Sequence, residues 1–197
     1  ADNNTAVGYY ALEANTGSTN TAVGAYAAYL NTSATHICAF GYDALGDNTT
    51  GSYNTAFGAN ALCKNTTGTN NSAFGRNALN ANTGGNNTAV GFEALDSNTT
   101  GGDNTSVGAH SLQTNTTGQY NTAVGQAALN LNTTGDSNTA LGQGSLRANT
   151  TADHNSAVGT NSLANNTTGT SNTSVGSHAS NAITTGSENT SIGHNAL

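Results

Sequence analysis

The sequence predicts an all-β fold, a parallel β-solenoid or β-roll of about twelve 17-residue coils that spans residues 1–197 as a single repeat domain. Three observations predict this fold. One glycine-terminated motif recurs along the whole chain, two apolar columns recur in register with it, and Asn-Thr-rich turns separate the copies. A fixed period of this kind marks a repeat architecture in which each copy packs only on its neighbours.

The motif is represented by Asn121-Thr-Ala-Val-Gly125-Gln-Ala-Ala-Leu129, where Asn121 is position 1 of the repeat. Its position 5 glycine recurs twelve times at spacings of 17 residues, with two spacings of 16. These glycines are Gly8, Gly24, Gly41, Gly58, Gly75, Gly91, Gly108, Gly125, Gly142, Gly159, Gly176 and Gly193.

Positions 4 and 9 are apolar in nearly every copy, and we expect them to form two core ladders on two short extended segments per coil. The position 4 ladder is Val7, Val23, Phe40, Phe57, Phe74, Val90, Val107, Val124, Leu141, Val158, Val175 and Ile192. The position 9 ladder includes Leu45, Leu62, Leu79, Leu95, Leu112, Leu129, Leu146 and Leu163. Positions 3 and 8 hold Ala or Ser and are expected to point the other way, as a lateral seam.

Position 12 is Asn from Asn15 to Asn166, with Ile183 as the exception, and it opens an Asn-Thr-Thr-Gly turn in most copies. Parallel stacking places each Asn over its counterpart one coil away, where the amides can hydrogen-bond along the axis. The predicted polar ladder contains Asn48, Asn65, Asn98, Asn115, Asn132, Asn149 and Asn166. The same Asn-Thr-Thr pattern matches an N-glycosylation acceptor, which an inward-facing side chain could not be.

Composition argues against several classes of partner. The chain carries a formal net charge of −7 and only three Lys and Arg residues, which argues against nucleic-acid binding. No apolar run approaches the roughly 20 residues of a membrane helix, so we expect no membrane insertion. The two cysteines, Cys38 and Cys63, occupy different repeat positions, and their pairing is left open.

Acidic residues and histidines are scattered over many repeat positions, so the sequence predicts neither a metal ladder nor a cofactor. No Gly-x-Ser-x-Gly motif or phosphate-binding loop occurs, and we expect a protein that is not an enzyme. Tyrosines gather near the N-terminus instead, including Tyr9, Tyr10, Tyr26 and Tyr29. These four represent either neutral variation on an exposed face or a contact patch for a partner subunit or a glycan.

The unit Asn-Thr-Ala-Val-Gly-x-x-Ala-Leu resembles the repeat arrays of phage and bacterial tail-fibre-like surface proteins. More distantly, it is similar to the head repeats of trimeric autotransporter adhesins, which fold as a parallel β-roll. The resemblance covers the whole chain, and it implies a cell-surface protein concerned with adhesion or fibre formation.

These observations predict a secreted or cell-surface structural subunit of an extracellular filament, whose partners are copies of itself. Neither end of the sequence has a capping helix, a proline or a charged guard strand, so head-to-tail strand stacking is expected. The alternative is a repeat segment of a trimeric adhesin or tail fibre that binds a cell-surface glycan. A minor alternative is an ice-binding protein, suggested by the Thr columns.

Overall fold

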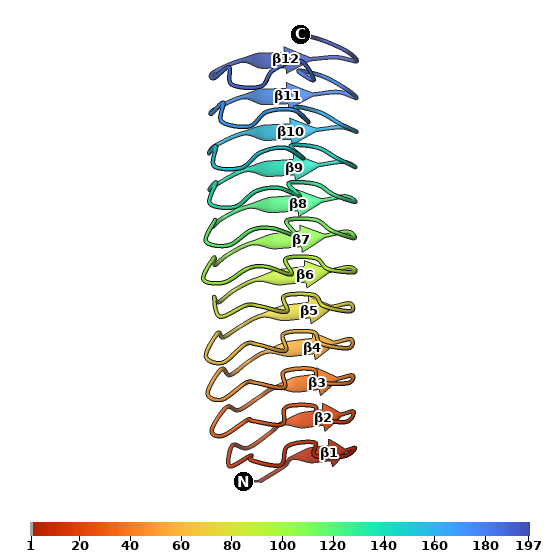
Figure 1. The fold of residues 1–197 in the computed structure, drawn as a ribbon, viewed down its shortest axis with the longest axis vertical. Helices are drawn as coiled ribbons and strands as arrows, with labels where there is room; N and C mark the ends of the chain where they lie inside the picture. The colour runs from red at the N-terminus through yellow and green to blue at the C-terminus, as the bar shows by residue number, and fades with distance from the viewer. Residues whose placement is uncertain (1) are drawn as a thin grey trace.

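The computed structural model describes residues 2–197 and shows an all-β solenoid of twelve short strands in one parallel sheet (Figure 1). The strands stack in sequence order, so every neighbour in the sheet is a neighbour in the repeat. They are β1 (Thr5–Val7), β2 (Thr21–Val23), β3 (Cys38–Phe40), β4 (Thr55–Phe57), β5 (Ser72–Phe74), β6 (Thr88–Val90), β7 (Thr105–Val107), β8 (Thr122–Val124), β9 (Thr139–Leu141), β10 (Ser156–Val158), β11 (Thr173–Val175) and β12 (Thr190–Ile192).

The strands pair in register, so that equal repeat positions lie side by side. In the β8–β9 pair, for example, Thr122 lies beside Thr139 and Val124 beside Leu141. The two 16-residue copies keep this register, as Ser72 beside Thr88 shows. The missing residue is absorbed in the turn that follows position 12, because the strand and its ladder tolerate no shift.

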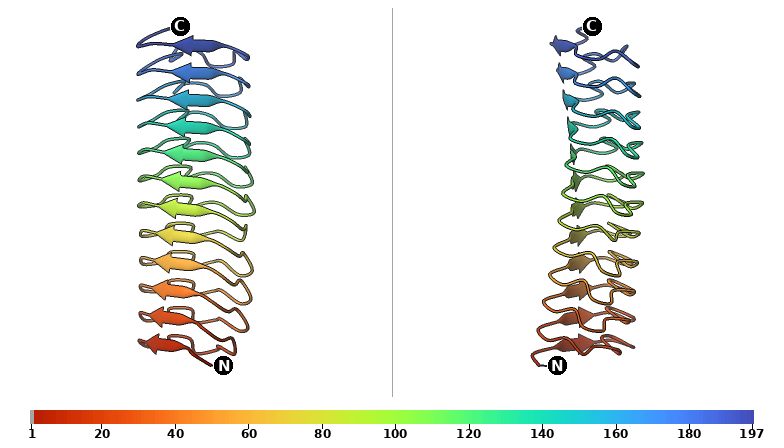
Figure 2. Two further views of the ribbon diagram at one scale, coloured as in Figure 1. Left: turned by 180° about the vertical axis from the view of Figure 1, so that it is seen from behind. Right: turned by 90° about the vertical axis from the view of Figure 1, so that its left-hand side faces the viewer.

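The prediction of two extended segments per coil is corrected by the structure, which has one three-residue strand per coil. The rest of each coil is a series of turns, and in the edge-on view the strands form one side of the rod while the turns form the other (Figure 2, right). Tight turning needs left-handed backbone, and the residues at positions 7, 9 and 17 have positive φ in every described coil. Leu129 at position 9, for example, has φ 51°.

The core is narrow and lies between the strand and the turn that follows it. Leu at position 9 is fully buried from Leu45 to Leu163 and meets the small residues of positions 3 and 8, such as Ala123 and Ala128. Left-handed backbone at a non-glycine residue costs about 1–2 kcal/mol. Burying a leucine side chain contributes about 1.5–3 kcal/mol, which is enough to offset that cost.

The predicted position 4 core ladder is wrong, because the structure places this column on the outside of the sheet. Val124 and Phe57 are each 38% exposed, and Val7 is 57% exposed. Within each strand, positions 2 and 4 face outward and position 3 faces inward, since side chains alternate along a strand. The interior has room only for Ala or Ser at this point, so positions 3 and 8 belong to the core and not to a lateral seam. The corrected residues are Val7, Val23, Phe40, Phe57, Phe74, Val90, Val107, Val124, Leu141, Val158, Val175 and Ile192.

The predicted asparagine ladder at position 12 is confirmed. From Asn31 to Asn166, each Nδ2 donates to the Oδ1 of the Asn one coil before, the first of which is Asn15, giving nine consecutive bonds of 2.6–3.4 Å. Each amide also donates to a carbonyl of its own turn, as Asn115 does to Gly118 at 3.0 Å. All of the seven predicted members are fully buried: Asn48, Asn65, Asn98, Asn115, Asn132, Asn149 and Asn166.

A second buried asparagine column runs along position 1. The Oδ1 of Asn121 accepts a bond from the backbone N–H of Asn138 at 3.0 Å, and its Nδ2 donates to the carbonyl of Gly135 at 2.8 Å. The side chains at position 1 therefore link each coil to the next by hydrogen bonds to backbone groups. The side chains at position 12 link the coils by hydrogen bonds to one another. Ile37 interrupts the position 1 column near its start.

The position 12 ladder stops at Ile183, which occupies the place of the next asparagine. Asn166 Oδ1 consequently has no hydrogen-bond partner, although it is buried. A buried acceptor without a partner costs about 1–3 kcal/mol. The last coil is thus held by one asparagine column fewer than the coils before it.

Replacing Ile183 with Asn is expected to raise the free energy of unfolding by about 1 kcal/mol, because its amide supplies the missing donor to Asn166 Oδ1. Denaturant melts followed by circular dichroism measure the change. The matched control is Ile183→Ala, which removes the same apolar contact with the core without adding a donor. The prediction fails if the Asn variant loses as much stability as the Ala variant.

Candidate functional site

Residues 2–197 enclose no pocket, so the candidate functional features are surfaces on the outside of the rod. Three of them carry side chains that could bind a partner or take part in a reaction. They are a polar cluster around His110, a cluster of tyrosines near the N-terminus, and the outer face of the sheet.

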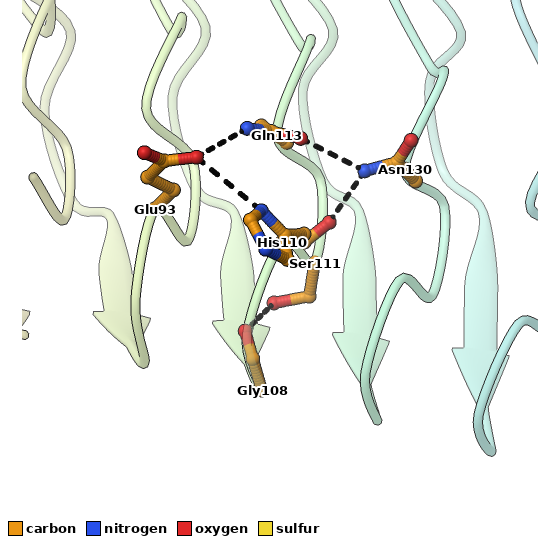
Figure 3. Close-up of polar contacts among 6 residues, drawn as sticks. All are labelled: Glu93, Gly108, His110, Ser111, Gln113 and Asn130. Atoms are coloured by element: carbon orange, nitrogen blue, oxygen red, sulfur yellow. Dashed lines mark hydrogen bonds and ion pairs between the residues drawn. The ribbon is translucent and has the colours of Figure 1, made fainter.

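The polar cluster crosses three adjacent coils (Figure 3). Glu93 Oε2 lies 3.3 Å from His110 Nδ1 and accepts a hydrogen bond of 2.7 Å from Gln113 Nε2. Asn130 Nδ2 donates to the His110 carbonyl at 2.8 Å and to Gln113 Oε1 at 3.2 Å. These contacts run from each coil to the next, so the cluster joins three coils on their turn side.

Ser111 follows His110 in sequence, but its hydroxyl turns into the core. Ser111 Oγ donates to the Gly108 carbonyl at 2.9 Å and lies against Ser106 Oγ, and the residue is fully buried (Figure 3). A nucleophilic serine needs a base within hydrogen-bond reach and access to substrate. Ser111 is fully buried, so it does not supply a nucleophile to this cluster, which is best explained as a contact between coils.

The predicted tyrosine patch is brought together by the stacking of the first coils. Ring centroids lie 4.0 Å apart for Tyr9 and Tyr10, 5.6 Å for Tyr9 and Tyr26, and 5.8 Å for Tyr26 and Tyr29. Tyr42 extends the cluster, with its ring 5.9 Å from Tyr26. We call these five residues the tyrosine cluster. Tyr42 is at position 6 of the repeat, as Tyr9 is, and Tyr26 is at position 7, as Tyr10 is; these shared positions were the signal for the fifth member.

The tyrosine cluster exposes aromatic surface and neutral hydroxyls. Tyr9 is 61% exposed and Tyr42 is 58% exposed. A side-chain hydrogen bond with Tyr10 is the main cause that raises the pKa of Tyr9, and the negative charge of Glu13 is the main cause that raises the pKa of Tyr29. Both hydroxyls therefore stay protonated near neutral pH and can donate hydrogen bonds.

The two cysteines are free and occupy different environments. Cys38 lies at position 2 of β3, on the outer face of the sheet, where burial raises the pKa of its thiol. Cys63 is half-buried on the turn side, and its Sγ donates to Asp43 Oδ2 at 3.1 Å. Burial first, and then this bond and the Asp43 charge, raise the pKa of Cys63 to about 12.

Cys63 is expected to react with a thiol reagent much more slowly than Cys38 at pH 8, because only the thiolate is nucleophilic. A shift of the Cys63 pKa from 9.0 to about 12 lowers its thiolate fraction roughly a thousandfold. Because the folded protein holds the thiol proton to higher pH than the unfolded chain does, the fold also loses stability as pH rises from about 9 to about 12. Mass spectrometry of alkylated peptides measures both rates, with Cys38→Ser as the control for assignment. Equal rates at the two thiols would contradict the prediction.

No helix among residues 2–197 has the length and apolar character to cross a membrane. The same residues bring together no group of three or more His, Cys, Asp or Glu side chains that could hold a metal ion. The fold and its ladders define a β-solenoid repeat protein. A scan of protein-family models and searches of curated proteins and of solved structures found no match to this chain.

Proposed function

We propose that this protein is a non-enzymatic structural rod, a component of an extracellular filament or fibre that lengthens by in-register stacking of further coils. The observation that carries the proposal is the pair of asparagine columns, which make the contacts between coils nearly identical along the chain. The resemblance of the repeat to surface-fibre arrays supports the extracellular assignment.

The contact between coils is directional, which favours open growth. Each coil offers an asparagine Oδ1 toward the C-terminal end, as Asn121 does to Asn138, and a backbone N–H toward the N-terminal end, as Asn121 does to Asn104 at 2.9 Å. Unlike faces that complement one another form a heterologous contact, and repetition of such a contact generates a filament. Further coils of the same chain or the coils of another copy would satisfy the same groups.

Electron microscopy of the purified protein tests the proposal. Twelve coils at about 4.8 Å each give a rod of about 58 Å, so a growing filament shows particles that are multiples of this length. The blocking variant is Thr190→Pro, which removes an N–H from the outer edge of β12 without touching the β11–β12 bonds, and the control is Thr190→Ala. Growth that stops with Pro and continues with Ala supports the proposal. Particles of uniform short length at high concentration in the wild type overturn it.

The tyrosine cluster supports a second candidate function, a binding module for a cell-surface glycan. Exposed aromatic rings offer flat apolar faces to sugar rings, and their hydroxyls offer donors to sugar oxygens. Glycan-array binding that is lost in Tyr9→Ala, Tyr10→Ala and Tyr26→Ala variants would favour it, with Tyr120→Ala, an exposed tyrosine far along the rod, as the control. Absence of binding in the wild type, or equal binding by the control and the three variants, removes this candidate.

A further inference from the structure

The outer face of the parallel sheet is a surface that the stacking of coils leaves unused. We call the outward residues at positions 2 and 4 of the twelve strands the sheet face. Position 2 holds Thr, Ser or Cys, and position 4 holds Val, Phe, Leu or Ile. The face runs along one side of the rod, because all twelve strands are three residues long and lie in one in-register sheet (Figure 2).

The apolar column of the sheet face is continuous and open to solvent. Phe74 is 42% exposed, and Val90, Val158 and Val175 are each 38% exposed. Phe57 stacks on Phe40 with ring centroids 4.6 Å apart and nearly parallel planes. Monomeric proteins rarely expose an apolar patch larger than a few hundred square ångströms, so a stripe along the whole rod indicates an interaction surface.

The sheet face contains no charged residue at either position, although the chain carries a net charge of −7. The acidic residues lie elsewhere in the repeat, as Asp103 at position 17 and Glu93 at position 7 do. Two such faces can therefore approach one another without burying a charge, which would cost several kcal/mol per ion. This favours an uncharged partner surface over an acidic or basic one.

The size of the face matches the needs of a pair. Strands about 4.8 Å apart, each with three residues of about 3.3 Å, give twelve strands a face of about 570 Å². Two faces together bury about 1,100 Å², which reaches the roughly 1,000 Å² expected of a specific interface. The partner that has the same length, the same strand spacing and the same twist is a second copy of this chain.

We propose that two copies pair through their sheet faces, as a two-layered β-sandwich of two rods. The contact is isologous, because the same surface is used by both copies. A closed ring of three would need two different surfaces on each rod, whereas the sheet face is a single surface. Facing sheets pack about 10 Å apart, so the apolar columns interdigitate to form a second core outside the solenoid.

Mass per unit length in electron microscopy tests the pairing separately from filament growth, since pairing sets the width and growth sets the length. Wild-type particles are expected to have twice the mass per length of one chain. The double variant Val90→Lys/Val124→Lys places charge on the sheet face and is expected to halve this value. Its matched control, Thr117→Lys/Thr134→Lys, places the same charges on exposed turn residues and leaves the value unchanged. Circular dichroism establishes that each variant is folded.

A measurement on the wild type guards against variants that do not fold. Cys38 lies on the sheet face, so pairing would cover its thiol. We therefore expect its alkylation to slow as the protein concentration rises and a larger fraction of the rods is paired. Wild-type rods with the mass per length of one chain, or of three, overturn the proposal. So does a Cys38 rate that is independent of concentration. Thermal hysteresis together with single-chain width would assign the sheet face to ice instead.

Discussion

Replacing Gly125 with Ala is expected to lower the free energy of unfolding by about 3 kcal/mol or more. Gly125 has φ +132°, a backbone conformation that side chains rarely permit, and it lies directly against the next coil. An added Cβ would stand 2.6 Å from both the carbonyl carbon and the carbonyl oxygen of Gly142. Neither backbone can move without breaking the register of the sheet. Denaturant melts of purified variants measure the loss.

Gly102→Ala is the matched control for this substitution. Gly102 lies at position 16, where other coils carry Thr69 and Gln119, its φ is outside the left-handed region, and an added Cβ would stand 3.2 Å from the carbonyl oxygen of Gly85. We expect a loss well below that of Gly125→Ala. If both variants lose equal stability, close stacking at the position 5 glycines is not what fixes the distance between coils.

Replacing Asn115 with Leu is expected to lower the free energy of unfolding by about 3 kcal/mol, because it breaks the ladder in its middle. The bond of 2.8 Å to Asn98 Oδ1 is lost, which leaves a buried acceptor without a donor. Asn132 Nδ2 at the same time loses the acceptor that it contacts at 2.9 Å. Thermal and denaturant unfolding followed by circular dichroism measure the effect.

Asn165→Leu is the control, because Asn165 is exposed and its amide bonds only to groups at the surface. Its loss should stay below about 1 kcal/mol, as for most surface substitutions. A ladder variant that is as stable as this control would show that the buried amides contribute no net stability.

The repeat period and the polar columns made much of the fold predictable from the sequence. A period of 17 residues that keeps Asn in one place has few explanations other than stacked coils, and the structure has the predicted ladder from Asn15 to Asn166. The tyrosine cluster followed from the same reasoning, because residues at neighbouring positions of adjacent coils lie close together. Periodicity thus predicts which residues lie above one another.

Periodicity does not predict which columns point inward, and here the sequence interpretation misplaced three of them, at positions 3, 4 and 8. The large apolar side chain of Val124 suggests a core position, whereas the small side chain of Ala123 suggests a close-packed lateral seam. The structure buries Ala123 and exposes Val124, since Leu129 turns inward with left-handed backbone and fills the narrow interior. Such a conformation is unfavourable for leucine in isolation, so propensity alone gave no sign of it. The sheet face was missed for the same reason.

Deleting one whole period tests most directly the claim that the rod consists of interchangeable coils in register. Removal of residues 109–125 joins Gly108 to Gln126 and restores the order of positions, whereas removal of residues 109–116 does not. The claim predicts that the first variant unfolds cooperatively with a β-sheet spectrum like that of the full chain, as measured by circular dichroism during thermal unfolding. It predicts that the second variant loses this transition. Equal tolerance of both deletions, or loss of folding in the first, would contradict it.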